Sequence, residues 1–201
     1  MGDELVVAAP ADKTGPQQEQ RIWKIIVVGD MNTGKTSIIE RYCDGNFIEY
    51  YRPTAGELNM DTAGTEKYQS LIQLYYRGAK GLFIVYDVTD LNSLHNLATW
   101  MKNIDDFAPS NVVRILIGNK CDLESNRKIS TEEGLLVAKH FGIPFFELSS
   151  KNNINVDDSF LKMISMINEM ESEITIKNDF VILEDQLMLC DNNPSKSKCN
   201  C

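Results

Sequence analysis

Eight consecutive residues, from Gly29 to Thr36, have the types and spacing needed to hold a phosphate group. They read G-D-M-N-T-G-K-T, which matches the pattern G-x-x-x-x-G-K-[ST]. The glycines let the backbone curl so that several N–H groups converge on phosphate oxygens. Lys35 can reach the β- and γ-phosphates, and the Thr36 hydroxyl is a ligand type that Mg²⁺ accepts. A chance glycine turn is the alternative, and the apolar strand pattern before the motif and the helical pattern after it disfavour that alternative.

A second group of polar residues can select a base. Asn119, Lys120 and Asp122 stand in the sequence N-K-C-D, directly after an apolar run. The Asp122 carboxylate can accept hydrogen bonds from the N1–H and 2-amino groups of guanine, and adenine lacks both donors. The Lys120 stem can lie along the base, and residues 149–151 (S-S-K) can offer a backbone N–H to guanine O6. An ordinary polar turn is the alternative for N-K-x-D taken alone.

The phosphate loop and the N-K-C-D loop each follow an apolar run, so a set of buried strands is needed to position them. Continuous apolar runs predict strands that are buried on both faces, and segments with helical periodicity lie between them. The runs are 25–28, 82–86, 112–117 and 144–148, and the helical segments are 36–43, 67–77, 94–107, 131–141 and 156–170. Alternation of this kind predicts an α/β fold of the P-loop NTPase type, with three layers and a mostly parallel sheet.

Length and composition set the remaining limits. The chain has 201 residues, a net charge of −9 and five cysteines, and a pI near 4.8. The acidic balance disfavours binding to nucleic acid or to an anionic bilayer by charge alone, and the odd number of cysteines predicts reduced thiols in an intracellular protein. We expect a disordered extension over residues 1–20, one domain over residues 21–171, and a flexible tail over residues 172–201.

Together the motifs resemble those of the Ras-superfamily small GTPases, and more closely the Rab family. The matching stretches are D-T-A-G at 61–64, Y-Y-R-G-A at 75–79, I-V-Y-D-V-T at 84–89, G-N-K-C-D-L at 118–123 and the final C-N-C. The resemblance covers about residues 20–170 and the C-terminus. It implies GTP and GDP binding with Mg²⁺, GTP hydrolysis, and a membrane-attached switch in vesicle traffic at the cytosolic face of endomembranes.

The resemblance also assigns roles to residues between the two motifs. Phe47 resembles the aromatic residue that packs against guanine, with a position in the core as the alternative. Tyr51 resembles the tyrosine that closes over the phosphates, and Thr54 the threonine that binds Mg²⁺ and senses the γ-phosphate. Asp61 resembles the aspartate that holds Mg²⁺ through water, with a helix N-cap as the alternative. The Gly64 backbone N–H resembles a γ-phosphate contact.

The predicted site therefore has three overlapping groups of residues. The nucleotide-binding residues are Gly29, Asp30, Met31, Asn32, Thr33, Gly34, Lys35, Thr36, Ser37, Phe47, Tyr51, Thr54, Asp61, Gly64, Asn119, Lys120, Asp122, Ser149, Ser150 and Lys151. The metal-binding residues are Thr36, Thr54 and Asp61. The catalytic residues are Lys35, Thr54, Gly64 and Thr65.

Two substitutions relative to the family pattern predict slow hydrolysis. Thr65 stands where relatives have a glutamine that orients the attacking water, and a threonine lacks that amide. Met31 stands where the family prefers Gly, Ser or Ala, and its long side chain would crowd the γ-phosphate and the path of an activator's arginine. A nucleotide-binding pseudo-GTPase scaffold without useful turnover is the alternative that these two residues favour.

The third departure is a shortened segment between Thr54 and Asp61. Only six residues, Ala55 to Met60, separate them, whereas relatives have a β-hairpin there. Leu58 and Met60 resemble a remnant of the family's third strand, and the second strand is missing. This predicts an exposed sheet edge, reduced stability and weakened effector binding. A truncated isoform or flawed gene model that no longer holds nucleotide is the alternative reading.

The C-terminus resembles a lipid-attachment site. Cys199 and Cys201 match the Rab ending that receives two geranylgeranyl groups, and two chains anchor a protein stably where one does not. The implied partners are an exchange factor, a GTPase-activating protein, a GDP-dissociation inhibitor, a prenyl transferase with its escort protein, and effectors. The resemblance implies a monomer held at the membrane by its lipid anchor.

Overall fold

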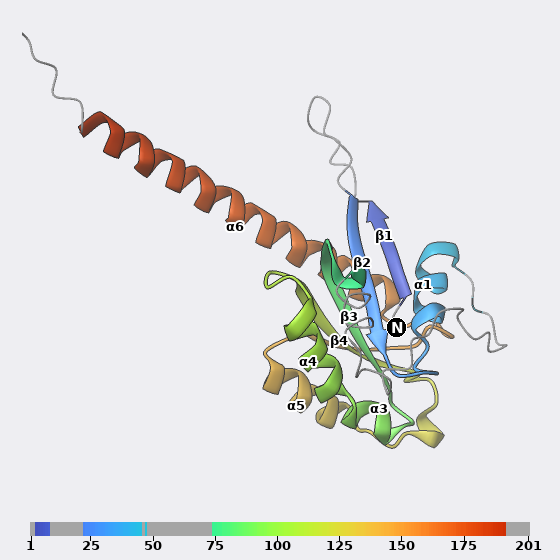
Figure 1. Ribbon diagram of the computed structural model, residues 1–201. Helices are drawn as coiled ribbons and strands as arrows, with labels where there is room; N and C mark the ends of the chain where they lie inside the picture. The colour runs from blue at the N-terminus through green and yellow to red at the C-terminus, as the bar shows by residue number, and fades with distance from the viewer. Residues whose placement is uncertain (1–2, 9–21, 46, 48–73, 192–201) are drawn as a thin grey trace, which may run out of the picture.

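The computed structural model describes residues 3–8, 22–45, 47 and 74–191. Five strands form one sheet in the order β1-β2-β3-β4-β5 (Figure 1). They are β1 (Asp3–Ala8), β2 (Ile22–Gly29), β3 (Ala79–Asp87), β4 (Val113–Asn119) and β5 (Phe145–Leu148). Strands β2 to β5 are mutually parallel, which confirms the predicted parallel sheet.

Helices cover both faces of the sheet, so the three-layer α/β prediction is confirmed. They are α1 (Lys35–Asp44), α3 (Leu91–His95), α4 (Leu97–Phe107), α5 (Thr131–Phe141) and α6 (Val156–Asp191), with a 3₁₀ turn at Glu124–Asn126. One core cluster joins α1 and α6 to the face that carries Ile25 and Val27. The other joins α4 and α5 to the face that carries Ile26 and Val28.

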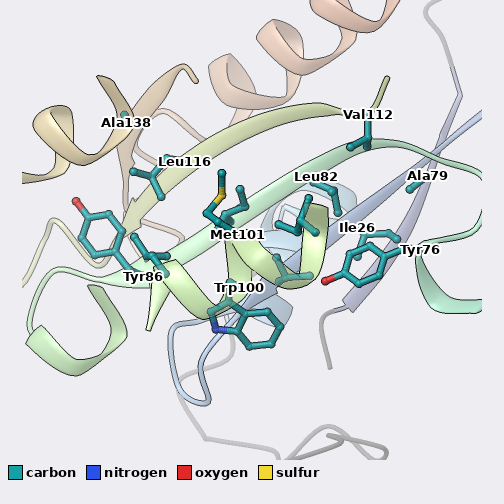
Figure 2. Packing of buried hydrophobic residues seen from close by; sticks show 14 of the residues in the cluster. Ile26, Tyr76, Ala79, Leu82, Tyr86, Trp100, Met101, Val112, Leu116 and Ala138 are labelled. Atoms are coloured by element: carbon teal, nitrogen blue, oxygen red, sulfur yellow. The ribbon is translucent and has the colours of Figure 1, made fainter. Parts of the chain in front are cut away.

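Figure 2 shows the second of these clusters from close by, with Trp100 and Met101 contributed by α4 and Ala138 by α5. The strands are buried on both sides, which is why their sequences are continuous apolar runs without alternation. Trp100 is only 7% exposed. Its position fixes α4 beside the end of β2, where the phosphate-binding motif begins.

The N-terminal segment departs from the predicted disorder. Residues Asp3–Ala8 form β1, which pairs antiparallel with β2 in a register that runs from Asp3–Val27 to Ala8–Ile22. The segment reads D-E-L-V-V-A, and its valines favour a strand. The edge of β2 is thus paired along Ile22–Val27, and β1 is the outermost strand on this side of the sheet. The remnant strand predicted around Leu58 and Met60 lies outside the described residues.

The C-terminal segment also departs from the prediction. The sequence predicted a flexible tail from residue 172, but α6 continues to Asp191 (Figure 1). No glycine or proline interrupts residues 156–191, and uninterrupted helix formers sustain a helix after its amphipathic period has faded. Glu171 ties α6 to the sheet through the Trp23 indole N–H at 3.4 Å and the Lys80 ammonium at 3.0 Å. Within the described residues, no helix combines the length and apolar character that crossing a membrane requires.

Candidate nucleotide-binding site

The loop between β2 and α1 has the strand–loop–helix form that the phosphate-binding motif requires. Gly29 ends β2 with φ 145°, and Gly34 precedes α1 with φ 90°. A Cβ on Gly29 would collide with the Val85 carbonyl oxygen, and one on Gly34 with the Asn119 side-chain amide. Both glycines are therefore needed for the conformation and for close packing.

The Asp30 carbonyl oxygen is the inner anchor of this loop. It accepts hydrogen bonds from the Lys35 ammonium at 2.8 Å and from the Thr33 hydroxyl at 2.9 Å. Lys35 is only 6% exposed, so its charge lies inside the curl of the loop. Thr36 and Ser37 follow in the first turn of α1, where the helix N-terminus favours an anion.

The Asp30 carboxylate is the outer anchor. One oxygen accepts from the Trp100 indole N–H at 2.8 Å, and the other from the Asn96 amide at 2.6 Å. Asn96 joins α3 to α4 and Trp100 lies on α4, so the side chain fastens the loop to the opposite layer. Sequence reasoning named Asp30 as a nucleotide contact, and it gave no signal for Trp100 or Asn96 as its partners.

The middle of the loop is exposed. Met31 is 53% exposed, and Asn32 adopts a left-handed conformation with φ 63°, which asparagine tolerates better than most residues. The methionine side chain thus stands on the open side of the loop. This position is the one at which the sequence predicts crowding of a bound γ-phosphate.

Asn119, which is fully buried, joins the phosphate loop to the two base-selecting loops. Its amide nitrogen donates to the Thr33 carbonyl at 2.8 Å, and its amide oxygen accepts from the Ser150 backbone N–H at 3.4 Å. The sequence predicted Asn119 as a nucleotide contact. The structure gives it a bridging position between three segments that are far apart in the chain.

Asp122 and Lys120 are both held by side-chain contacts. The Ser149 hydroxyl donates to one Asp122 oxygen at 2.5 Å, which orients the carboxylate beside the 149–151 loop. The Lys120 ammonium pairs with Asp87 of β3 at 2.5 Å, and Lys120 has φ 68°. Asp87 also accepts from the Thr89 backbone N–H and hydroxyl. Sequence reasoning did not single out Asp87 as a partner of the lysine.

Cys121 lies between these two residues, and burial raises the pKa of its thiol above the ordinary value. The carboxylates of Glu147 and Asp122 raise it further. The thiol is therefore protonated at neutral pH, which makes it a poor nucleophile. Cys121 is therefore a small neutral residue within the base-selecting segment.

Arg41 of α1 connects the helix to the 149–151 loop. Its guanidinium donates to the carbonyl oxygens of Ser150 at 2.7 Å, Lys151 at 2.9 Å and Gly45 at 2.6 Å. The guanidinium carbon also lies 6.0 Å from the centre of the Phe47 ring, within the range of a cation–π contact. No motif marked Arg41 in the sequence.

The described residues thus bring together the phosphate loop, N-K-x-D, S-S-K and Phe47. The remaining predicted residues lie outside the described part of the chain, and their roles stay predictions. They are Tyr51, Thr54, Asp61, Gly64, Thr65, Cys199 and Cys201.

Comparison with known proteins gives a consistent result. The Ras family profile matches residues 24–169. A Ras-related protein RIC1 from Oryza sativa is 38% identical over 76% of this chain and 84% of its own length. A Ras-related protein Rab-13 from Bos taurus is 35% identical over 89% of this chain and 96% of its own. The GTP-binding protein ypt2 from Schizosaccharomyces pombe is 36% identical over 78% of this chain and 86% of its own length.

Proposed function

The chain belongs to the Ras family as a small GTPase of the Rab type, a GTP hydrolase, and on that premise we propose that it is a slow, membrane-attached switch in vesicle traffic. One observation carries the nucleotide part of the proposal. Asn119 ties the phosphate loop to the base-selecting loop through Thr33 and Ser150, so the groups proposed to contact phosphate and base are held in one hydrogen-bonded unit. Such preorganisation lowers the cost of binding.

Asp122 is the residue that we propose reads guanine. Ser149 fixes one carboxylate oxygen at 2.5 Å, and the carboxylate can accept from guanine N1–H and the 2-amino group. Replacing Asp122 with alanine should weaken GDP binding by roughly 100-fold or more, because each lost bond to a charged group is worth about 1.5–3 kcal/mol. Asp105→Ala is the control, since Asp105 pairs with Arg114 on an outer surface.

The donor set suits Mg²⁺, which prefers hard oxygen ligands. Thr36 would supply a hydroxyl from the first turn of α1, with Thr54 and Asp61 as the further predicted ligands. When bound, the ion would neutralise charge on the phosphate oxygens. Lys35, which already lies within the loop at 2.8 Å from the Asp30 carbonyl oxygen, would stabilise charge that develops on the γ-phosphate as water attacks.

Slow turnover follows from two residues. Met31 stands exposed on the loop, and Thr65 replaces the water-orienting glutamine of relatives. The double variant Met31→Ser with Thr65→Gln should raise the single-turnover rate of phosphate release at least about tenfold, with each single variant as a control. A double variant no faster than the unmodified protein would contradict this reasoning.

Membrane attachment is proposed from Cys199 and Cys201. The resemblance makes them acceptors of two prenyl groups, whose combined apolar length gives stable anchoring. It also supplies the proposed partners: exchange factor, GTPase-activating protein, GDP-dissociation inhibitor, prenyl transferase with escort, and effectors. In cells, Cys199→Ser with Cys201→Ser should move the protein from the membrane fraction to the supernatant, whereas the control Cys190→Ser should stay with membranes.

The nucleotide carried by the purified protein tests the proposal as a whole. It is released by heat and resolved by chromatography. GTP in excess of GDP would support slow hydrolysis, and GTP without measurable phosphate release would favour a nucleotide-binding scaffold. Absence of guanine nucleotide, with no thermal shift on adding GDP and Mg²⁺, would refute the switch and favour a truncated form that cannot hold its ligand.

A further inference from the structure

We propose that Arg41 is a positioning residue for recognition of the O6 edge of the guanine base. The inference rests on the proposed guanine-nucleotide function and names a residue that no motif assigns to it. Arg41 does not need to touch the nucleotide. It fixes the backbone of Ser150 and Lys151 through their carbonyl oxygens, while Asn119 directs the Ser150 N–H. Together these contacts hold the loop edge that we propose meets O6.

The contacts of Arg41 span two segments more than 100 positions apart in the chain. Its Nε and Nη2 atoms donate to the carbonyl oxygens of Ser150 and Lys151 at 2.7 and 2.9 Å, across separations of 109 and 110 residues. Its Nη1 atom donates to the Gly45 carbonyl at 2.6 Å. The Gly45 backbone N–H in turn bonds the Arg41 carbonyl at 3.1 Å. The residue therefore closes the end of α1 and holds the 149–151 loop at once.

The planarity of the peptide bond turns these carbonyl contacts into control of N–H direction. The Ser150 carbonyl and the Lys151 N–H belong to one peptide plane and point to opposite sides of it. A carbonyl drawn toward Arg41 therefore turns the Lys151 N–H away from Arg41. The Ser150 N–H is directed separately, toward the Asn119 amide oxygen at 3.4 Å. These contacts thus give the Ser150 and Lys151 N–H groups fixed directions.

The type of side chain matters because the three acceptors are spread out. A guanidinium is a planar fork with donors at fixed separations, whereas the ammonium of lysine is a single point. A lysine ammonium also has three donors, but they radiate from one nitrogen and cannot reproduce the separate contacts of Nε, Nη1 and Nη2. The guanidinium carbon lies 6.0 Å from the centre of the Phe47 ring, so one side chain contacts both the loop proposed at the base edge and the aromatic residue predicted at the base face.

The Asp122 carboxylate, which we propose contacts the N1–H and 2-amino groups of guanine, is held by contacts that do not involve Arg41. Ser149, which donates to Asp122, is held by a two-way backbone bridge with Ile154, at 3.1 and 3.0 Å. Loss of Arg41 should therefore loosen the O6 contact and leave the 2-amino contact in place. A loss of affinity that depends on O6 but not on the 2-amino group would not result from general destabilisation of the protein.

The test is competition binding with three diphosphates on the full chain, measured by displacement of a fluorescent GDP derivative. GDP is compared with 6-thio-GDP, in which the weak acceptor sulfur replaces O6, and with IDP, which lacks the 2-amino group. The variants are Arg41→Gln and Arg41→Lys, with Arg114→Gln as the control, because Arg114 pairs with Asp105 at 2.6 Å away from the site.

We expect the unmodified protein to prefer GDP over both analogues. Both Arg41 variants should narrow the preference for GDP over 6-thio-GDP at least about fivefold and change the preference over IDP by less than about twofold, while Arg114→Gln changes neither. Arg41→Lys retains the charge and the stem, so it provides a folded variant should Arg41→Gln unfold.

The outcomes separate the two ideas. Failure of the unmodified protein to bind GDP would refute the proposed function itself. GDP binding with equal affinity for 6-thio-GDP would show that backbone N–H groups do not read O6, and would overturn the inference alone. Full discrimination in Arg41→Lys, or equal losses toward both analogues, would overturn it as well.

Discussion

Replacing Asp30 with alanine should release the phosphate loop from the layer of helices behind it. The carboxylate accepts from the Trp100 indole N–H at 2.8 Å and from the Asn96 amide at 2.6 Å. Its backbone carbonyl, which alanine retains, still accepts from Lys35 and Thr33. The substitution therefore removes the outer anchor of the loop and leaves the inner anchor in place.

The two lost hydrogen bonds contribute different amounts to the free energy of unfolding. Trp100 is only 7% exposed, so its N–H would lose a charged partner and remain poorly hydrated, which costs about 1.5–2.5 kcal/mol. The Asn96 bond is exposed, and solvent screening reduces its worth to about 0.5 kcal/mol. The free energy of unfolding should fall by about 2–3 kcal/mol. For a domain of this size that lowers Tm by about 4–12 °C.

A double-mutant cycle measures the energy of the hydrogen bond between the Trp100 indole N–H and the Asp30 carboxylate, which accounts for most of the expected loss in stability. Thermal unfolding is followed for Asp30→Ala, Trp100→Phe and the double variant, with Asp105→Ala as the control for removing an exposed carboxylate. Trp100→Phe should cost about 1–2 kcal/mol less in the Asp30→Ala background than alone, because the indole N–H has already lost its partner. A Tm decrease below about 2 °C for Asp30→Ala, or a coupling energy near zero, would refute this account of the loop.

Three further predictions follow from the packing. Tyr86→Phe should leave stability unchanged or raise it by up to about 1 kcal/mol in urea unfolding, because the buried Tyr86 hydroxyl has no hydrogen-bond partner among the described residues; a loss above about 1 kcal/mol would reveal a hidden partner. Gly34→Ala should abolish the thermal shift on adding GDP, because its Cβ would collide with the Asn119 amide; a normal shift would contradict the loop geometry. Deleting residues 1–8 should lower Tm measurably through loss of the β1–β2 ladder, and an unchanged Tm would show that β1 adds nothing to stability.

The parts of the site that the sequence predicts are those whose chemistry is local. Eight contiguous residues define the phosphate loop, and four define N-K-C-D. In each case the residue types needed for the chemistry also define the backbone shape. Gly34 is an example, because both its φ of 90° and its contact with Asn119 require glycine. Motifs of this kind can be read without knowing the fold.

The supporting contacts could not be read in that way. Arg41 reaches Ser150 across 109 residues, and Trp100 reaches Asp30 across 70. An arginine on a helix and a tryptophan in an amphipathic segment are equally consistent with a surface and a core position. Only the packing of α1 and α4 against opposite faces of the sheet turns them toward the two loops. The length of α6 differs from the prediction for another reason: the apolar period fades after residue 170, but no glycine or proline interrupts the segment and the helix continues to Asp191.

The strand β1 changes what the short segment between Thr54 and Asp61 implies for stability. A missing neighbour would leave a row of backbone N–H and C=O groups on β2 without partners, and such an edge is costly when it is also apolar. β1 supplies that ladder from Ile22 to Val27 and ends two residues before Gly29. The sheet is therefore completed along most of β2, whereas Val28 and Gly29 pair only with β3 among the described residues. Any loss of stability caused by the shortened segment should then be confined to the end of β2 next to the phosphate loop. There it should lower nucleotide affinity more than the free energy of unfolding.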